Sequence, residues 1–243
     1  MPGSGEVACL LAGIDTQDDG FWFEIRAVGY GLESWDSWGV RCGFVQSFEV
    51  LERVLWQDVY TDSAGTPYPV HLAIQDAMGH RTADVYTFCM GHRGRILPSQ
   101  GKVRQAVPVS FTTLEYFPPD AKGRRVPIPG GLQLVKVDTN YFKNQLDGKL
   151  KIKAGDPGAW HFHAELSIEW ARHMVAEGIN EKGLWEPITA GRANHGWDCS
   201  VLIMAAREIL GVKFWPRPDG AEAQQTETRK RQLDDKPEKA RMW

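Results

Sequence analysis

The sequence of 243 residues lacks the features of membrane, secreted and thiolate-metal proteins. No stretch approaches the roughly 18 consecutive apolar residues of a membrane-spanning helix, and the N-terminus has neither a basic nor an apolar signal segment. Its four cysteines, Cys9, Cys42, Cys89 and Cys199, contain no C-x-x-C pair, which disfavours a zinc ribbon and suits free thiols in a reducing cytoplasm. We therefore expect a soluble protein that is not secreted and contacts no membrane.

Two common catalytic motifs are also absent. No G-x-x-x-x-G-K-[ST] segment occurs, so the chain has no recognisable P-loop, and no G-x-S-x-G elbow of a serine hydrolase is present. The sequence therefore offers no P-loop ATPase and no serine nucleophile of the elbow type.

Positive charge is scarce in the first third of the chain and concentrated in the middle. Residues 1–76 hold 3 basic and 12 acidic side chains, residues 77–136 hold 9 and 3, and the rest holds 16 of each, for a net charge of −3. A basic run is usually a solvated face, but it also suits a surface that follows phosphates. The candidate phosphate-binding residues are Arg81, Arg93, Arg95, Lys102, Arg104, Lys122, Arg124 and Arg125.

Hydrophobic patterns predict an α/β protein with a mixed sheet flanked by helices. Residues 7–14, 21–30 and 37–47 form a predicted three-stranded antiparallel meander, with a turn at Asp19-Gly20. Further strands are predicted at 70–74, 95–98, 132–137 and 160–163, and helices at 48–59, 81–90, 140–150, 166–176 and 193–210. The segments 61–69 and the basic stretch after residue 98 are predicted as loops. The βαβ order from residue 70 onward favours later strands that run parallel to the first.

The length is enough for one large domain or two small ones. We expect a single domain over residues 8–215, preceded by residues 1–7 as an N-terminal extension or a cloning remnant. Residues 216–243 are rich in Gln, Lys, Arg and Glu and are predicted as a charged tail.

Three aspartates occupy positions where a carboxylate is costly to place. Asp15 and Asp76 end two apolar strands, and in open α/β sheets the strand ends are where ligands gather. Asp198 shares the apolar stripe of the last helix, so its side chain is expected to point into the protein. A buried Asp is either salt-bridged or bound to a metal, and three of them at converging positions favour divalent cations.

The all-oxygen ligand set suits Mg²⁺ or Mn²⁺ better than zinc. Two such ions about 4 Å apart bridge a phosphodiester, one activating the water and the other stabilising the leaving 3′ oxygen. Asp18 and Asp19 are either turn residues or auxiliary ligands. His161 and His163 lie on one face of a predicted strand, an arrangement that is more often structural than metal-binding.

Several motifs occur in an order that resembles a known family. They are Ala12-Gly13-Ile14-Asp15-Thr16-Gln17-Asp18-Asp19, Asp76-Ala77-Met78-Gly79-His80, Gln100-Gly101-Lys102, Val137-Asp138-Thr139 with Lys143 and Leu146, Pro157-Gly158-Ala159-Trp160-His161-Phe162 and Arg192-Ala193-Asn194-His195-Gly196-Trp197-Asp198-Cys199. Together they resemble the nuclease domain of lambda-type (GpA-like) tailed-phage terminase large subunits, over roughly residues 8–211.

The resemblance implies a ribonuclease H-like fold and a metal-dependent endonuclease that cuts concatemeric phage DNA in the host cell cytoplasm. Asp15, Asp76 and Asp198 would be its catalytic, metal-binding triad, with two Mg²⁺ or Mn²⁺ ions as cofactors and the basic residues above as its DNA surface. Its implied partners are double-stranded DNA, the packaging ATPase domain, the small terminase subunit and the portal protein. The ATPase is absent from this sequence, which indicates an excised domain or a split gene.

A second departure from the family and two alternatives accompany this interpretation. The family carries an acidic residue after the Asn of its last motif, whereas His195 stands there in this chain. One alternative is a noncatalytic DNA clamp or portal-docking module with structural carboxylates. The other takes the segments around Asp15 and Asp76 as phosphate loops of an actin or sugar-kinase-like phosphotransferase, which needs about twice this length.

Overall fold

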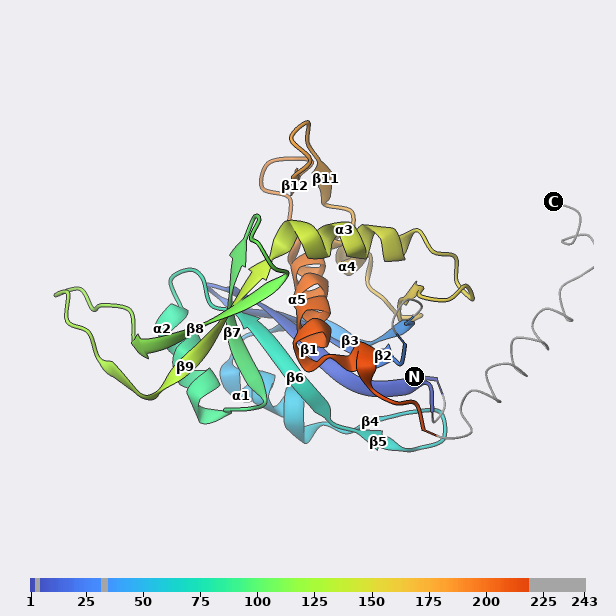
Figure 1. Ribbon diagram of the computed structural model, residues 1–243, viewed down its shortest axis with the longest axis horizontal. Coiled ribbons are helices and arrows are strands. Elements are labelled where there is room, and N and C mark those ends of the chain that lie inside the picture. Colours follow the sequence, from blue (N-terminus) through green and yellow to red (C-terminus); the bar gives the residue numbers. More distant parts are fainter. Residues whose placement is uncertain (3–4, 32–34, 219–243) are drawn as a thin grey trace, which may run out of the picture.

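The centre of the protein is an eight-stranded mixed sheet, seen in a computed structural model that describes residues 1–2, 5–31 and 35–218 (Figure 1). The strand order across the sheet is β10-β3-β2-β1-β6-β7-β9-β8. The strands are β1 (Val7–Gln17), β2 (Gly20–Gly29), β3 (Ser37–Val45), β6 (Val70–Asp76), β7 (Ile96–Lys102), β8 (Val109–Tyr116), β9 (Pro127–Asp138) and β10 (Trp160–His161).

The remaining elements are five α-helices and two short hairpins within the described residues. The helices are α1 (Phe48–Glu52), α2 (Thr82–Gly91), α3 (Thr139–Leu150), α4 (Ile168–His173) and α5 (His195–Leu210). A π-helical turn (Arg53–Gln57) follows α1, and a 3₁₀ turn (Val212–Phe214) follows α5. The hairpins are β4 (Tyr60–Thr61) with β5 (Pro67–Tyr68), and β11 (Glu177–Ile179) with β12 (Trp185–Pro187).

The predicted fold class is confirmed. β1, β2 and β3 form the antiparallel meander, and β1, β6, β7 and β9 run parallel to one another, so the architecture is consistent with a ribonuclease H-like fold. The last helix ends as predicted at Gly211, whose positive φ of 60° suits glycine.

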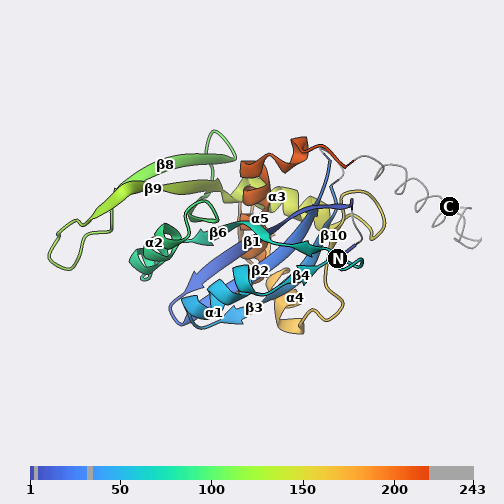
Figure 2. The same cartoon turned by 90° about the horizontal axis from the view of Figure 1, so that it is seen from below.

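Several predicted boundaries are wrong. The segment after residue 98 contains β8, which pairs with β9 in a long hairpin that extends away from the body of the protein (Figures 1 and 2). The predicted helix over 48–59 is a short α-helix that widens into the π-helical turn, the predicted loop over 61–69 holds the small β4–β5 hairpin, and the helix predicted at 166–176 is only α4. The domain limits stay a prediction, and residues 219–243 of the predicted tail lie outside the described residues.

Two hydrophobic cores cover the two faces of the sheet. One packs α1 and α2 against alternate residues of β1 and β2, such as Ile14 and Phe23. The other packs α3, α4 and α5 against the opposite face (Figure 2). Leu11 and Ile74 belong to this second core. Of the helices in the part of the chain that the structure describes, none is long and apolar enough to cross a membrane.

The close contact of α5 with the sheet depends on one glycine. A Cβ atom at Gly13 in β1 would lie 2.0 Å from the Cys199 carbonyl oxygen, closer than any side chain tolerates. The absent side chain lets the first turns of α5 rest directly on β1, which fixes the height of Asp198 above the sheet.

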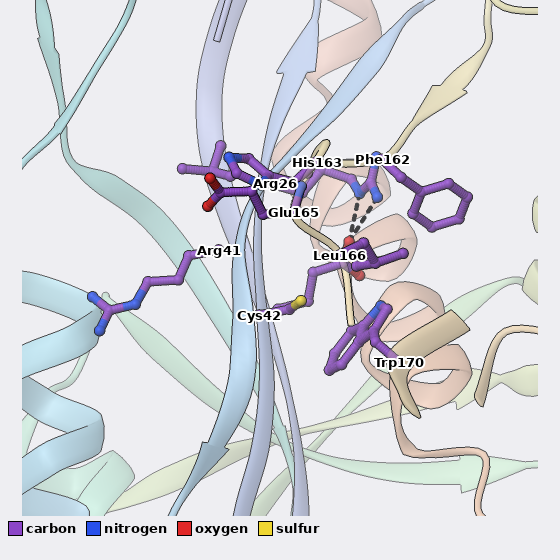
Figure 3. A pocket seen from close by; sticks show the side chains of 11 residues that line it. Arg26, Arg41, Cys42, Phe162, His163, Glu165, Leu166 and Trp170 are labelled. Carbon is purple, nitrogen blue, oxygen red and sulfur yellow. Dashed lines mark hydrogen bonds and ion pairs between the residues drawn. The ribbon is translucent and has the colours of Figure 1, made fainter. Parts of the chain in front are cut away.

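A buried ion pair ties α5 to the neighbouring strand. The Arg26 guanidinium, which is fully buried, lies 2.7 Å from Glu24 Oε1 in the wall of a cavity of about 170 Å³ beside β3 (Figure 3). The Ser200 hydroxyl of α5 donates a 2.6 Å hydrogen bond to the other Glu24 oxygen. Arg26 also donates to the His161 carbonyl oxygen and stacks 3.7 Å from the centre of the Trp160 ring. The pair therefore joins β2, the β10 segment and α5.

Candidate active site

The ends of β1 and β6 bring Asp15 and Asp76 to the same level of the sheet. The parallel register pairs Ile14 with Gln75, and the next residue of each strand is the aspartate. Because side chains alternate between faces, Asp15 lies on the face of Gly13 and Asp76 on the face of Ile74, and this face carries α5. The Thr16 hydroxyl donates to the Asp76 carbonyl oxygen at 2.6 Å, which holds the two strand ends together.

Asp198 lies in the first turn of α5, the helix that packs on β1 and β6. The positive end of the helix dipole favours a carboxylate there. Its side chain contacts Lys143 of α3 and is 35% exposed, so it points toward the protein as expected while part of it is open to solvent. The three predicted aspartates thus come from two strand ends and one helix start.

The electrostatics show that the three carboxylates act on each other. Burial, followed by the charges of Asp15 and Asp198, raises the pKa of Asp76 to about 7. Burial also raises the pKa of Asp198 to about 6, where the Lys143 ammonium works against the rise and the Asp15 charge adds to it. Burial together with neighbouring negative charge therefore makes the charged forms of Asp76 and Asp198 costly.

His195 connects α5 to Asp15. Its Nδ1 lies 2.7 Å from Asp15 Oδ2, and because a carboxylate only accepts, Nδ1–H is the donor. The imidazole stacks on Trp22 with ring centres 5.5 Å apart and meets the His173 ring edge-on. Gln17 donates to the same Asp15 oxygen at 2.9 Å, so two side chains hold that oxygen.

Asp198 has two donors that the sequence did not assign to the site. Lys143 Nζ of α3 lies 3.3 Å from Asp198 Oδ1, and the Asn194 amide donates to Asp198 Oδ2 at 2.9 Å. Both donors also contact Glu177 of β11. Burial acts to lower the pKa of Lys143, but the charges of Asp198 and Glu177 outweigh it and raise that pKa. Lys143 and Asn194 stand in the quoted motifs, whereas nothing in the local pattern around Glu177 indicates its role.

The donor set fits hard divalent cations in its chemistry. All three aspartates offer oxygen ligands, and Asp76 and Asp198 are destabilised as anions by their surroundings. Among the described residues, no three His, Cys, Asp or Glu side chains are grouped closely enough to hold a metal ion. The three carboxylates therefore match a hard cation in the chemistry of their oxygen atoms, without forming a closed cage among the described residues.

Asp18 and Asp19 lie at the rim of the site. Both are exposed in the β1–β2 turn, and Asp18 Oδ1 lies 3.2 Å from His80 Nδ1. They line a polar cleft of about 340 Å³ between this turn and residues 77–82. Their role as auxiliary ligands stays a prediction.

Four of the eight basic residues lie at the two ends of β7, and the other four lie elsewhere. Lys102 ends β7 and Arg104 follows it, beyond Ser99, which pairs with Asp76. Arg93 and Arg95 precede the N-terminal end of β7, and the Arg95 guanidinium lies over the Trp56 ring. The other four members are Arg81, which lies over Phe21 beside the cleft, and Lys122, Arg124 and Arg125 in the turn of the β8–β9 hairpin.

The two histidines of the β10 segment have structural partners. His161 stacks on Trp38 with ring centres 5.8 Å apart, and its Nε2 lies 3.4 Å from Asp36 Oδ1. His163 Nδ1 accepts from the Glu165 backbone N–H. Their structural interpretation agrees with these contacts.

Comparison with known proteins matches the chain to one family. The family model described as terminase large subunit gpA, endonuclease domain, matches residues 3–219. Neither the curated proteins nor the solved structures yield a match. Since the family model covers most of the chain, this protein belongs to the terminase large subunit gpA endonuclease-domain family, a nuclease family of phage DNA packaging.

Proposed function

We propose that this protein is a divalent-metal-dependent DNA endonuclease that hydrolyses phosphodiester bonds in concatemeric phage DNA. The observation that carries the proposal is that Asp15, Asp76 and Asp198 come from the ends of β1 and β6 and the start of α5, where the charge of Asp15 adds to the raised pKa values of Asp76 and Asp198. Such an arrangement is costly for the fold and is typical of a functional site.

The aspartates would hold two Mg²⁺ or Mn²⁺ ions. When bound, these cations supply the charge that activates a water and stabilises the leaving 3′ oxygen. The chain itself supplies placement: Gly13 seats α5, His195 and Gln17 hold Asp15, and Lys143 with Asn194 holds Asp198. Strand and helix ends are rigid supports, which suit chemistry that requires a narrow geometry.

Double-stranded DNA is the proposed substrate. Lys102 and Arg104 lie at and after the C-terminal end of β7, on the same side of the sheet as the end of β6 that carries Asp76. Arg81 lines the polar cleft beside it, so a phosphate backbone that crosses these strand ends meets positive charge. The packaging ATPase domain, the small terminase subunit and the portal protein are the proposed partners, and they would deliver the DNA.

The test is nicking of supercoiled plasmid by the purified chain with Mn²⁺ or Mg²⁺. We expect nicking that EDTA abolishes and that Asp15→Asn, Asp76→Asn and Asp198→Asn each abolish. Asp147→Asn, which changes a carboxylate of α3 that pairs with Lys151, is the matched control and should cut normally. DNA binding without any cutting would instead support the noncatalytic clamp or portal-docking module.

A further inference from the structure

Asp198 and three other polar side chains form a closed ring of contacts. Lys143 Nζ lies 2.7 and 2.8 Å from the two Glu177 oxygens and 3.3 Å from Asp198 Oδ1. The Asn194 amide nitrogen lies 2.6 Å from Glu177 Oε1 and 2.9 Å from Asp198 Oδ2. Two donors therefore bridge the same two carboxylates, and each Asp198 oxygen has a donor of its own.

The ring joins three segments that are distant in the sequence. Lys143 belongs to α3 and Glu177 to β11, while Asn194 and Asp198 flank the start of α5. A donor on each oxygen fixes the plane of a carboxylate, whereas a single donor leaves it free to rotate. The ring thus determines how Asp198 faces the site.

The Lys143–Glu177 pair is not explained by stability alone. Their side chains are 11% and 3% exposed, and removing such charges from water costs several kcal/mol per ion. Apolar residues of similar volume often serve the fold equally well or better. A buried pair that contacts a candidate catalytic carboxylate is therefore better accounted for by its effect on that carboxylate.

We propose that Lys143 and Glu177 are positioning residues for Asp198. Lys143 holds one Asp198 oxygen, Asn194 holds the other, and Glu177 fixes both donors. The inference rests on the proposed function, because the orientation of the Asp198 carboxylate matters for catalysis if Asp198 binds a cation. Groups that orient metal ligands typically change metal affinity or activity by about 10–100-fold when they are removed.

The double variant Lys143→Met/Glu177→Gln tests this role. It removes one buried charge of each sign, so the net charge is unchanged, and the amide oxygen introduced at position 177 can still accept from Asn194. We expect a melting temperature close to that of the parent. Calorimetric titration with Mn²⁺ should show binding at least tenfold weaker, and plasmid nicking should show kcat at least tenfold lower with an unchanged KM for DNA.

A matched pair on the same helix provides the control. Asp147 and Lys151 of the α3 C-terminal region form an ion pair at 2.6 Å, with the Lys151 side chain 72% exposed. Asp147→Asn/Lys151→Met makes the same change of charge away from Asp198 and should leave Mn²⁺ affinity and kcat unchanged.

The measurements separate failure of this role from failure of the proposed function. A folded double variant that binds Mn²⁺ and cuts like the parent overturns the positioning role. If that variant does not fold, Asn194→Ala removes one donor without exposing a buried charge, and unchanged Mn²⁺ affinity there overturns the role as well. A parent protein that binds Mn²⁺ but never cuts DNA contradicts the nuclease activity alone, because the Mn²⁺ affinities of the parent and the variants still test the positioning role. A parent that binds no Mn²⁺ contradicts both.

Discussion

The His195 imidazole donates from Nδ1 to Asp15 Oδ2 at 2.7 Å, across 180 residues of sequence. It joins the first turn of α5 to the end of β1, and Trp22 supports the ring from one side. The contact ties together the two elements that carry Asp15 and Asp198, so its loss should affect the site more than the fold.

We expect His195→Ala to lower the kcat of plasmid nicking by about 10–100-fold, since Asp15 loses one of its two side-chain donors. Single-turnover nicking with Mn²⁺ measures this change. His71→Ala, which removes an exposed histidine on β6 that contacts Trp215, should cut at the parental rate. Equal rates for the parent and His195→Ala would show that Asp15 needs no support from α5.

Asp76 makes the stability of the metal-free protein depend on pH. Its pKa of about 7 in the folded state lies above the ordinary value of 3.8, so the folded state binds the proton more tightly than the unfolded state does. This contribution is fully present below pH 4 and is lost as the pH rises through 7. At about 1.4 kcal/mol per pKa unit, the loss amounts to a few kcal/mol.

Asp76→Asn should therefore stabilise the metal-free protein more at pH 8 than at pH 5. Urea unfolding in EDTA at both pH values measures the difference, and Asp147→Asn serves as the control. A variant whose stability relative to the parent is the same at both pH values would contradict the raised pKa of Asp76.

The basic residues at the two ends of β7 should contribute differently to DNA binding. Lys102→Ala/Arg104→Ala should make the dependence of log K on log salt shallower by about 1 per lost phosphate contact. Arg93→Ala/Arg95→Ala makes the same change of charge at the opposite end of β7 and should leave the slope near that of the parent. Binding is measured in EDTA so that cutting does not interfere. A larger effect of the Arg93 and Arg95 changes would place the DNA at the other end of β7.

The buried pair beside β3 should be important for stability. Arg26→Met leaves the Glu24 carboxylate buried without its cation, which should cost about 3–5 kcal/mol of unfolding free energy. Glu24→Gln/Arg26→Met removes both charges and should recover most of that loss, because the amide oxygen still accepts from Ser200. Urea unfolding of both variants measures this, and a double variant less stable than Arg26→Met would contradict the account.

Local patterns in the sequence were sufficient for the centre of the fold. The apolar run ending at Asp15, the aromatic strand after it and the long helix ending at Gly211 are confirmed because each buries a periodic set of side chains. β8 was missed because it lies at the sheet edge, where Phe111 is half exposed and the alternation of burial is weak. Its partner β9 was predicted only in its buried second half.

The site was predictable where a carboxylate ends an apolar element, as at Asp15 and Asp76. Glu177 gave no such signal, because it lies on a three-residue strand. Its role depends only on its contacts with Lys143 and Asn194, which the fold brings to it. Contacts between distant short segments leave no periodicity in the sequence, so structure was required to find them.

The most direct test of the central claim is the position of Mn²⁺ in a crystal of the protein soaked in the metal, located by its anomalous scattering. The account predicts two ions at the edge of the sheet, held by Asp15, Asp76 and Asp198, with Lys143 still in contact with Glu177. Ions bound only elsewhere, or none at this edge at saturating Mn²⁺, would contradict it.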